Sequence, residues 1–323
     1  MENKKPLLSI CIPTYNRAEY LDKCLASIVS QKEFRGGNVE IVISDNASTD
    51  NTEDVVNRYQ EQYDNIFYSR NLENVCDNNF PIVIGNADGI FRKLCNDTII
   101  FHSKAIQYML NIIIENIDNK PVLFFMNSAD RKKKKKKYIV DGFDSFLKIA
   151  SFWTTWIASF GIWEDDFMKI KDKYEGCSLH LWQTKVLFEL IVQRESLIDN
   201  ERLFLIQDML KKDMSYGFFH VFYNNYLGLN EPYLKARILS KGTFKYLKKH
   251  LLFDFFSQWI INFHFHKEKY AVSSKNELMK AIFNSYHNEV YYILFLFRLR
   301  AAIFRVFIRR SLYGLILRCL PQL

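Results

Sequence analysis

The chain has 323 residues, enough for one large domain or for two modest ones, and its apolar and charged fractions are those of an ordinary folded protein. Its net charge of +8 is uneven, with a lysine run at 132–137 and an arginine-rich C-terminal stretch. Six scattered cysteines show neither C-x-x-C nor zinc spacing, which disfavours a zinc site and favours free thiols in a reducing compartment.

The N-terminus gives no sign of export. Met1 to Pro6 is polar and lacks the apolar core of a signal peptide. The sequence also lacks an uninterrupted apolar run of about 18 residues, so we expect no membrane-spanning helix. These patterns predict a cytoplasmic protein, and the basic C-terminal stretch adds the expectation that it is peripheral on the inner face of the cytoplasmic membrane.

Strand and helix patterns alternate through the first 126 residues. Short apolar runs predict strands at 7–12, 39–44, 66–69, 90–95 and 121–126. Apolar residues at helical spacing predict intervening helices, the first capped by Asn16 with Glu19, and later ones at 78–86 and 103–116. Alternation with short connections predicts an α/β fold with a mostly parallel central sheet and helices on both faces.

Helical patterns dominate the rest of the chain. We expect helices at 180–193, 201–211, 243–262 and 275–284. The sequence Asn230-Glu231-Pro232 interrupts the pattern, so we predict a first domain at 1–230 and a helical, basic extension at 231–323. Within the first domain, we assign a ligand-binding half to about 1–110 and a second half to about 111–230.

Polar residues follow three of the predicted strands. Thr14-Tyr15-Asn16-Arg17 follows the first, Asp45-Asn46 the second and Asn96-Asp97 the fourth. Ligands of parallel α/β sheets bind outside the carboxyl ends of the strands. The sequence therefore predicts a binding site at this edge of the sheet.

These segments carry a specific family resemblance. Ser9 to Arg17, which reads Ser-Ile-Cys-Ile-Pro-Thr-Tyr-Asn-Arg, resembles the opening of family 2 glycosyltransferases. Ile41 to Asp50 is similar to the second strand and loop of that family, and Asn71 to Asn74, followed by Asn79, is similar to its Asn-rich segment. Lys93 to Thr98 falls where the family has its Asp-x-Asp metal motif. Within the family, the chain looks most like bacterial surface-polysaccharide transferases of the capsule, O-antigen or lipooligosaccharide type.

The resemblance implies a GT-A fold and the transfer of a sugar from a nucleoside-diphosphate sugar to a glycan or polyprenyl-linked glycan. It also implies inversion at the anomeric carbon and a divalent cation, Mn²⁺ or Mg²⁺. Nucleotide-sugar contacts are then expected from Pro13, Thr14, Tyr15, Asn16, Arg17, Asp45, Asn74, Lys93 and Asn96. Tyr15 and Asp45 suit the base, and Arg17 and Lys93 suit the phosphates.

The metal motif is reduced to one acid. Asn96-Asp97-Thr98 has a single carboxylate where the family has two or three, so Asp97 is the expected metal ligand. Magnesium and manganese often take only one or two ligands from protein. The reduced motif keeps a second hypothesis open, a non-catalytic relative that binds a sugar nucleotide or supports a polysaccharide assembly complex.

An inverting transfer also needs a general base for the acceptor hydroxyl. The sequence offers His180, at the start of a predicted helix, and Asp166, within Glu164-Asp165-Asp166. Each has a structural alternative, because a lone histidine is more often structural and the acidic trio fits a solvated turn.

The C-terminal stretch mixes aromatic and basic residues. From Val290 to the end there are six arginines and no acidic residue. Such a helix can lie in a membrane interface with its arginines at anionic headgroups, or it can pack as a core or dimer helix. The lysine run 132–137 reads as a solvated loop or as a contact to an anionic membrane or lipid pyrophosphate. No nucleic-acid-binding motif is present, so we expect no nucleic-acid partner.

Overall fold

A computed structural model of the chain describes residues 5–127, 135–209, 217–266 and 275–319, with side chains as far as Arg310. The chain divides into two compact units. The first comprises Met1–Asp208 and Gly228–Thr243, and the second comprises Met209–Leu227 and Phe244–Leu323. The chain thus passes between the units more than once around the boundary predicted at residue 230.

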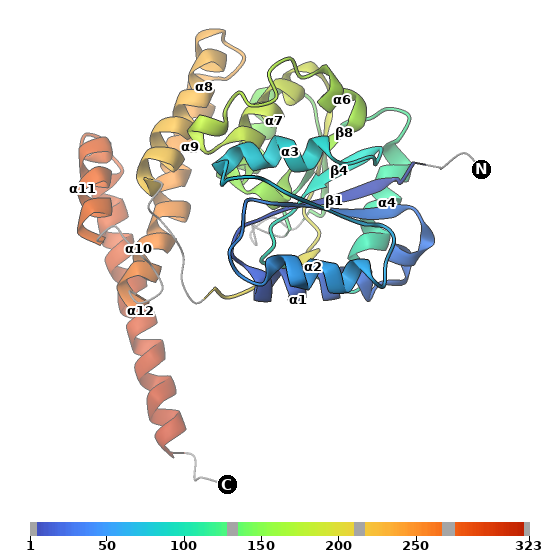
Figure 1. Cartoon of the computed structure of the whole chain (residues 1–323). Helices are drawn as coiled ribbons and strands as arrows, with labels where there is room; N and C mark the ends of the chain where they lie inside the picture. Colours follow the sequence, from blue (N-terminus) through green and yellow to red (C-terminus); the bar gives the residue numbers. More distant parts are fainter. Residues whose placement is uncertain (1–4, 128–134, 210–216, 267–274, 320–323) are drawn as a thin grey trace. The chain divides into compact units, whose positions relative to one another are not determined.

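The first unit is built on a five-stranded sheet in the order β3-β2-β1-β4-β8 (Figure 1). Its strands are β1 (Leu8–Thr14), β2 (Val39–Asp45), β3 (Ile66–Arg70), β4 (Phe91–Leu94) and β8 (Gly161–Trp163). The first four are mutually parallel, whereas β8 runs antiparallel to β4. The mostly parallel sheet predicted from the alternation of elements is confirmed.

Helices cover both faces of this sheet, as Figure 1 shows with α1 and α2 on one face and α3 on the other. The helices of this half are α1 (Ala18–Val29), α2 (Thr52–Gln60), α3 (Asn79–Gly85) and α4 (Ala105–Asn116). The strands carry near-continuous apolar runs because both faces are buried, and β2 is buried at every position. One apolar core packs the first two strands against α1 and α4.

Two smaller sheets complete the first unit. β5 (Ile99–Phe101) pairs antiparallel with β10 (Phe204–Ile206). A three-stranded sheet has the order β6-β9-β7 and comprises β6 (Val122–Phe125), β9 (Ser196–Asp199) and β7 (Lys137–Val140). The strand predicted at 121–126 therefore exists but belongs to this separate sheet.

Short helices connect these strands. They are α5 (Phe143–Ala150), α6 (Glu164–Lys169) and α7 (Trp182–Gln193), with 3₁₀ turns that include η2 (Cys76–Asn78) and η5 (Cys177–Leu179). The first residue of β8 is Gly161. A Cβ at this position would lie 2.4 Å from the Phe91 ring, which is too close. Aromatic packing between neighbouring strands thus requires a glycine at this position.

Two local predictions are wrong. The helix expected at 201–211 is contradicted by strand β10, since pairing with β5 outweighs the local helical pattern. Asn16 does not cap α1, because its backbone is left-handed with φ of 51° and the N-cap position is Arg17. Asp50 caps the helix from outside instead, accepting from the backbone N–H of Ala18 at 3.0 Å.

The second unit is helical. Its elements include π-helical turns at His220–Asn225 and Leu251–Phe256, α10 (Ser257–Phe265), α11 (Lys275–Tyr286) and α12 (Tyr292–Cys319). Two further helices, α8 (Tyr226–Lys235) and α9 (Lys241–His250), each contain residues of both units. Within the described residues, no helix has the length and apolar character needed to cross a bilayer.

Candidate active site

Parallel pairing aligns the carboxyl ends of the strands. Thr14 at the end of β1 is the register partner of Asp45 on β2, which is in turn the partner of Arg70 on β3. On the other side of β1, the backbone N–H of Cys95 donates to the carbonyl of Cys11 at 2.8 Å, which directs the chain after β4 along the end of β1. The polar segments that follow these strands therefore meet at one edge, which we call the carboxyl edge.

Asp97 lies at the centre of this edge and is almost fully buried. The Thr14 hydroxyl donates to its Oδ2 at 3.0 Å, and Nη1 of Arg17 donates to its Oδ1 at 3.1 Å. Burial raises the pKa of Asp97, and Arg17 and Thr14 oppose that shift by stabilising the carboxylate. Three residues predicted separately for this site are thus joined in one ion-pair network.

Asn96 supplies a second oxygen beside this carboxylate. Its Oδ1 is buried and has no hydrogen-bond partner, which is unusual for a polar atom away from water. The described residues contain no cluster of three or more metal-ligating acids, cysteines or histidines. The residues present therefore fit a cation that takes one or two ligands from protein and the rest from a bound phosphate, rather than a cation held by protein alone.

The loop after β2 is braced by Asp45. Its Oδ1 accepts from the backbone and the hydroxyl of Ser48, and its Oδ2 accepts from the Tyr68 hydroxyl at 2.8 Å. Burial and this bond to Asp45 raise the pKa of Tyr68. Arg70 lies 3.7 Å from the same carboxylate. Asp45 is fully buried, so in this structure it shapes the loop instead of presenting its oxygens to solvent.

Asparagines fix the neighbouring loops. Oδ1 of Asn16 accepts from the backbone N–H of Thr49 at 2.7 Å, which joins the loop after β1 to the loop after β2. Oδ1 of Asn74 accepts from the side-chain amide of Asn46 at 2.8 Å, which joins that second loop to the segment before α3. The three loops form one connected rim around the carboxyl edge.

Tyr15 and Arg17 are among the side chains of this rim that solvent reaches. Tyr15 is 42% exposed, and the Arg17 side chain is 40% exposed although its guanidinium holds Asp97. Pro13 precedes them near the end of β1 and is partly buried. An exposed aromatic ring and a partly exposed cation thus lie on the same loop as the contacts to the buried carboxylate.

Lys93 is a correction to the predicted site. Its side chain is fully buried in β4, and its Nζ donates to the carbonyls of Leu94, Ala158 and Phe160. Burial lowers the pKa of Lys93 to about 8. All three ammonium protons are used inside the fold, so the predicted contact between Lys93 and a phosphate is wrong.

Asp166 lies at the opposite edge of the sheet, which removes it from the candidate bases. Because β8 is antiparallel to β4, Trp163 pairs with Phe91 at the amino end of the parallel strands, and α6 starts there. Asp166 forms an ion pair with Arg194. Its neighbour Glu164 accepts from Arg92 at 3.1 Å. The acidic trio thus has structural partners and no access to Asp97.

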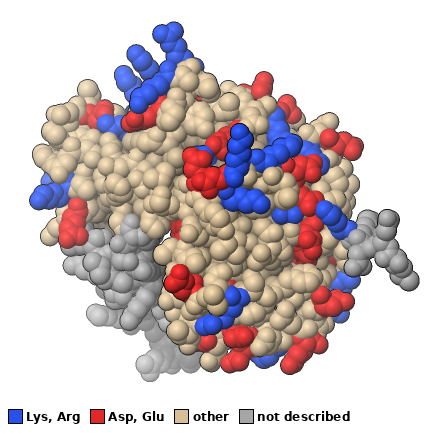
Figure 2. Space-filling model, turned by 45° about the horizontal axis from the view of Figure 1, so that its top comes forward, with Lys and Arg blue, Asp and Glu red and all other residues tan. Residues whose placement is uncertain are grey.

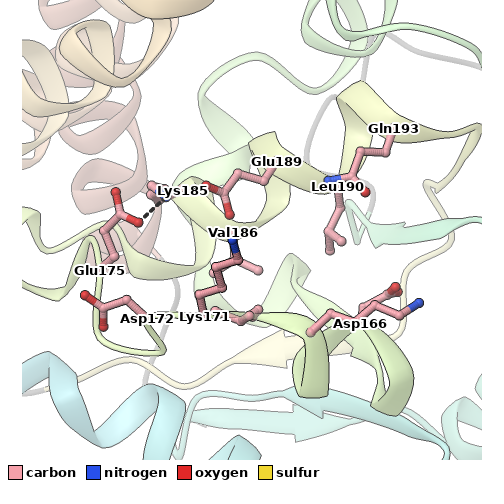
Figure 3. Close-up of a pocket in the computed structure, with 11 residues that line it drawn as sticks. Asp166, Lys171, Asp172, Glu175, Lys185, Val186, Glu189, Leu190 and Gln193 are labelled. Carbon is pink, nitrogen blue, oxygen red and sulfur yellow. Dashed lines mark hydrogen bonds and ion pairs between the residues drawn. The ribbon is translucent and has the colours of Figure 1, made fainter.

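A pocket of about 280 Å³ adjoins Asp166 between α6 and α7. Figure 3 shows Asp166 at one side and the ion pair of Glu175 with Lys185, 2.8 Å long, at the other. None of the carboxyl-edge residues lines this pocket. Asp166, Glu175, Lys185 and Glu189 of its lining form ion pairs, and the pocket lies apart from the carboxyl edge.

His180 reaches the carboxyl edge through a residue that the sequence did not single out. Nδ1 of His180 lies 3.2 Å from Oδ2 of Asp77, and the His180 side chain is 37% exposed. Asp77 belongs to η2, directly after the Asn74 segment. Burial raises the pKa of Asp77, and His180 opposes the shift. An imidazole oriented by a carboxylate is a suitable general base.

Several residues of this edge were missed because they carry no motif. Asp77, Tyr68 and Arg70 act through contacts that only the folded chain reveals. The one available signal was position, since Arg70 directly follows a predicted strand and Asp77 follows the asparagine-rich segment.

Charged side chains are interspersed on the molecular face drawn in Figure 2, where lysine and arginine lie among aspartate and glutamate. Of the lysine run singled out in the sequence, 132–134 lie outside the described residues. Lys136 pairs with Glu201 at 2.8 Å, and Lys137 begins β7.

Known proteins resemble this chain most clearly over its first third. Residues 9–116 match the family model described as glycosyl transferase family 2. Abequosyltransferase RfbV of Salmonella typhimurium is 47% identical over 85 residues, which are 26% of this chain and 25% of that protein. Validoxylamine A glucosyltransferase of Streptomyces hygroscopicus subsp. jinggangensis is 47% identical over 57 residues, or 18% of this chain and 13% of that protein. The matches thus span a quarter or less of these relatives.

Solved structures share the fold over most of the chain. TarS of S. aureus, residues 1–349 in complex with UDP-GlcNAc, has a TM-score of 0.58 at 16% identity and covers 86% of this chain and 80% of that one. The mannosyltransferase PcManGT from Pyrobaculum calidifontis, in complex with GDP-Man and Mn²⁺, has a TM-score of 0.54 at 13% identity, covering 88% and 89%. These similarities confirm the GT-A fold expected from the sequence.

Proposed function

We propose that the chain, whose residues 9–116 match glycosyl transferase family 2, transfers one sugar from a nucleoside-diphosphate sugar to a glycan or lipid-linked glycan. The pathway we propose is the synthesis of a bacterial surface polysaccharide, supported by the similarity to RfbV. The observation that carries the proposal is the carboxyl edge, where Asp97, Arg17 and the unpartnered Asn96 oxygen meet.

The donor's nucleotide lies over the rim of three loops. The exposed ring of Tyr15 stacks on the base, and the Asp45 brace holds the loop beneath it. Asn16 and Asn74 contribute by locking the loops to one another. Preorganised loops matter here because they reduce the ordering cost that nucleotide binding would otherwise carry.

The diphosphate needs positive charge as the glycosidic bond breaks. Arg17 suits this role, since its side chain is partly exposed and its guanidinium lies beside Asp97. A divalent cation, Mn²⁺ or Mg²⁺, would be held by Asp97 and Asn96 together with donor phosphates, and when bound it would neutralise charge on the leaving group. Arg17 and Asp97 thus act together at the leaving-group side.

The acceptor hydroxyl attacks the anomeric carbon from the side opposite the diphosphate, with inversion. The new C–O bond forms as the bond to the diphosphate oxygen breaks, and the nucleoside diphosphate leaves with that electron pair. His180 accepts the hydroxyl proton on Nε2 in the tautomer whose Nδ1–H donates to Asp77. Asp77 therefore orients the base and stabilises its protonated form.

Donor turnover tests the proposal directly. The full chain is incubated with a panel of UDP- and GDP-sugars and Mn²⁺, and the released diphosphate is measured. We expect release with one base class, and release that is lost in Asp97→Ala but kept in Asp64→Ala, a control at an exposed turn.

Calorimetry separates the enzyme from a non-catalytic relative. We expect UDP or GDP to bind more tightly in the presence of Mn²⁺, and Mn²⁺ alone to bind weakly because the protein supplies few ligands. Nucleotide binding without metal dependence, together with no turnover of any donor, would overturn the catalytic proposal in favour of the binding relative.

A further inference from the structure

The helix α12 exposes an apolar stripe along its described part. Ile293, Phe297, Phe304 and Ile308 follow one another at intervals of four, seven and four residues, which places them on one face of a helix. Their exposed fractions are 66%, 66%, 62% and 39%. Four large apolar side chains on one exposed face are more than the scattered single residues of an ordinary surface.

This stripe is not the face by which α12 packs into its own unit. Tyr292, Phe295 and Leu299 are the buried positions among the helix residues whose side chains are described, and Phe295 contacts Phe253 with ring centroids 5.8 Å apart. These positions lie on the opposite side of the helix from the stripe. The stripe is therefore not needed to pack α12 against the rest of its unit.

Arginines border the stripe on both sides. Arg298, Arg305 and Arg309 follow one another at seven and four residues along one margin, and Arg300 lies at the other. All four are exposed, and no acidic residue occurs from Val290 to the C-terminus. Whatever covers the stripe must accept apolar side chains in the middle and positive charge along the margins.

We propose that this face of α12 docks on an anionic lipid surface, with the apolar stripe below the headgroups and the arginines at the level of the lipid phosphates. Long cationic side chains can extend sideways to phosphates while an apolar face is buried. The docking proposal goes beyond the proposed function. One consequence rests on that function: a docked enzyme would meet a lipid-linked acceptor at the same surface.

Two other occupants fit less well. A second copy of the chain would bring arginine margins against arginine margins in either helix orientation, with no acidic residue on this face to pair with them. A nucleic acid would contact cations at the centre of its site, whereas here the centre is aliphatic and aromatic. An anionic lipid surface alone matches both the centre and the margins.

Vesicle sedimentation with the full chain tests the proposal. The probes are phosphatidylcholine vesicles with and without 30 mol% phosphatidylglycerol. Binding is measured at about 0.1 M salt, where charges are weakly screened, and at about 0.5 M salt, where they are strongly screened. We expect binding to the anionic vesicles at low salt, with a loss of at least tenfold in apparent affinity for Arg298→Gln/Arg305→Gln/Arg309→Gln, since each cation near such a surface is worth about fivefold.

The apolar part is tested by Phe297→Ser/Phe304→Ser, for which we expect a similar loss. Controls change the same kinds of residue elsewhere. Phe67→Ser replaces an exposed aromatic on β3, and Lys32→Gln/Arg58→Gln/Lys235→Gln removes the same net charge from exposed positions. Both controls should bind the vesicles as the unchanged chain does.

Equal loss in controls and stripe variants would overturn the proposal, as would equal binding to neutral vesicles. Loss of a concentration-dependent dimer in the stripe variants would identify a second copy as the occupant instead, and loss of RNA binding would identify a nucleic acid. Donor hydrolysis measured without vesicles separates the two proposals. Stripe variants should retain it, whereas a chain that docks but hydrolyses no donor would contradict only the proposed function.

Discussion

The two edges of the central sheet both hold buried charge, but they hold it differently. At the amino edge, Oε1 of Glu40 accepts from the Ser9 hydroxyl at 2.5 Å and from two backbone N–H groups, and Arg92 donates to Glu164 and to two carbonyls. At the carboxyl edge, the Asn96 oxygen has no partner and the Arg17 side chain is 40% exposed.

The difference lies in pairing: the buried polar groups named at the amino edge all have partners, whereas the carboxyl edge keeps a neutral amide oxygen without one. A buried polar group that is fully paired holds the fold in one conformation. A buried group without a partner carries a free-energy cost of about 1–3 kcal/mol, which a bound ligand can relieve. The carboxyl edge is therefore the edge at which we propose ligand binding, although both edges are rich in polar residues.

The largest expected effect comes from Asp97. We predict that Asp97→Ala lowers kcat/KM for the donor by about a thousandfold, because stabilising the charge on the leaving group usually accounts for much of the rate acceleration. Steady-state release of the nucleoside diphosphate measures it. Activity within threefold of the unchanged chain would remove Asp97 from the site.

His180 comes next. We expect His180→Ala to lower kcat for transfer by about a hundredfold, as is typical for loss of a general base. The donor KM should stay the same because the imidazole faces the acceptor. His287→Ala, at an exposed histidine of the second unit, is the matched control and should leave transfer unchanged.

Asp77 should matter through His180. We predict that Asp77→Asn lowers kcat by about tenfold and leaves the donor KM unchanged, since the amide lacks the negative charge that stabilises the protonated imidazole and can turn its NH2 group toward Nδ1, which favours the wrong tautomer. The double variant Asp77→Asn/His180→Ala should be no worse than His180→Ala. Additive losses in a double-mutant cycle would show that the two residues act independently.

Glu40 tests the amino edge. We expect Glu40→Gln to lower the free energy of unfolding by about 1–3 kcal/mol, because a buried charged acceptor of three hydrogen bonds becomes neutral. Denaturant unfolding measures this loss. The donor KM should not change, and a raised KM would contradict the distinction between the edges.

Lys93 gives a pH signature of stability, with no expected effect on donor turnover. Its pKa is about 8 in the fold and about 10.4 in an unfolded chain. Between these two pKa values, Lys93 is protonated in the unfolded chain but not in the folded chain. The free energy of unfolding therefore rises with pH in this range. We predict that the unfolding free energy of the unchanged chain, relative to Lys93→Met, rises by at most about 3 kcal/mol from about pH 8 to about pH 10.5. A flat difference would show that Lys93 is not desolvated in the fold.

Much of the fold was predictable from sequence because the strands of a parallel sheet are buried on both faces and therefore appear in the sequence as apolar runs. The same patterns located the carboxyl edge, since Thr14, Asp45 and Asp97 each follow such a run. The helix predicted at 201–211 failed because the pairing partner of β10 lies about a hundred residues away, at β5.

The failures within the site have a common physical cause. Lys93 and Asp166 have suitable chemistry at suitable positions in the sequence, but their side chains are used by partners from distant segments, Ala158 and Arg194. Conversely, the role of Asp77 depends on a contact with a residue about a hundred positions away. Residue type and spacing predict which groups are available, whereas long-range contacts decide which of them are already occupied.

The reversed direction of β8 has a consequence for engineering. The chain leaves the sheet at the amino edge, anchored by Glu164 to Arg92, and returns to the carboxyl edge, anchored by His180 to Asp77. Residues 165–179 thus run from one edge of the sheet to the other between two fixed attachment points. Sequence changes at exposed positions of this connection, such as Met168 and Tyr174, should therefore leave the donor half and the His180–Asp77 contact in place.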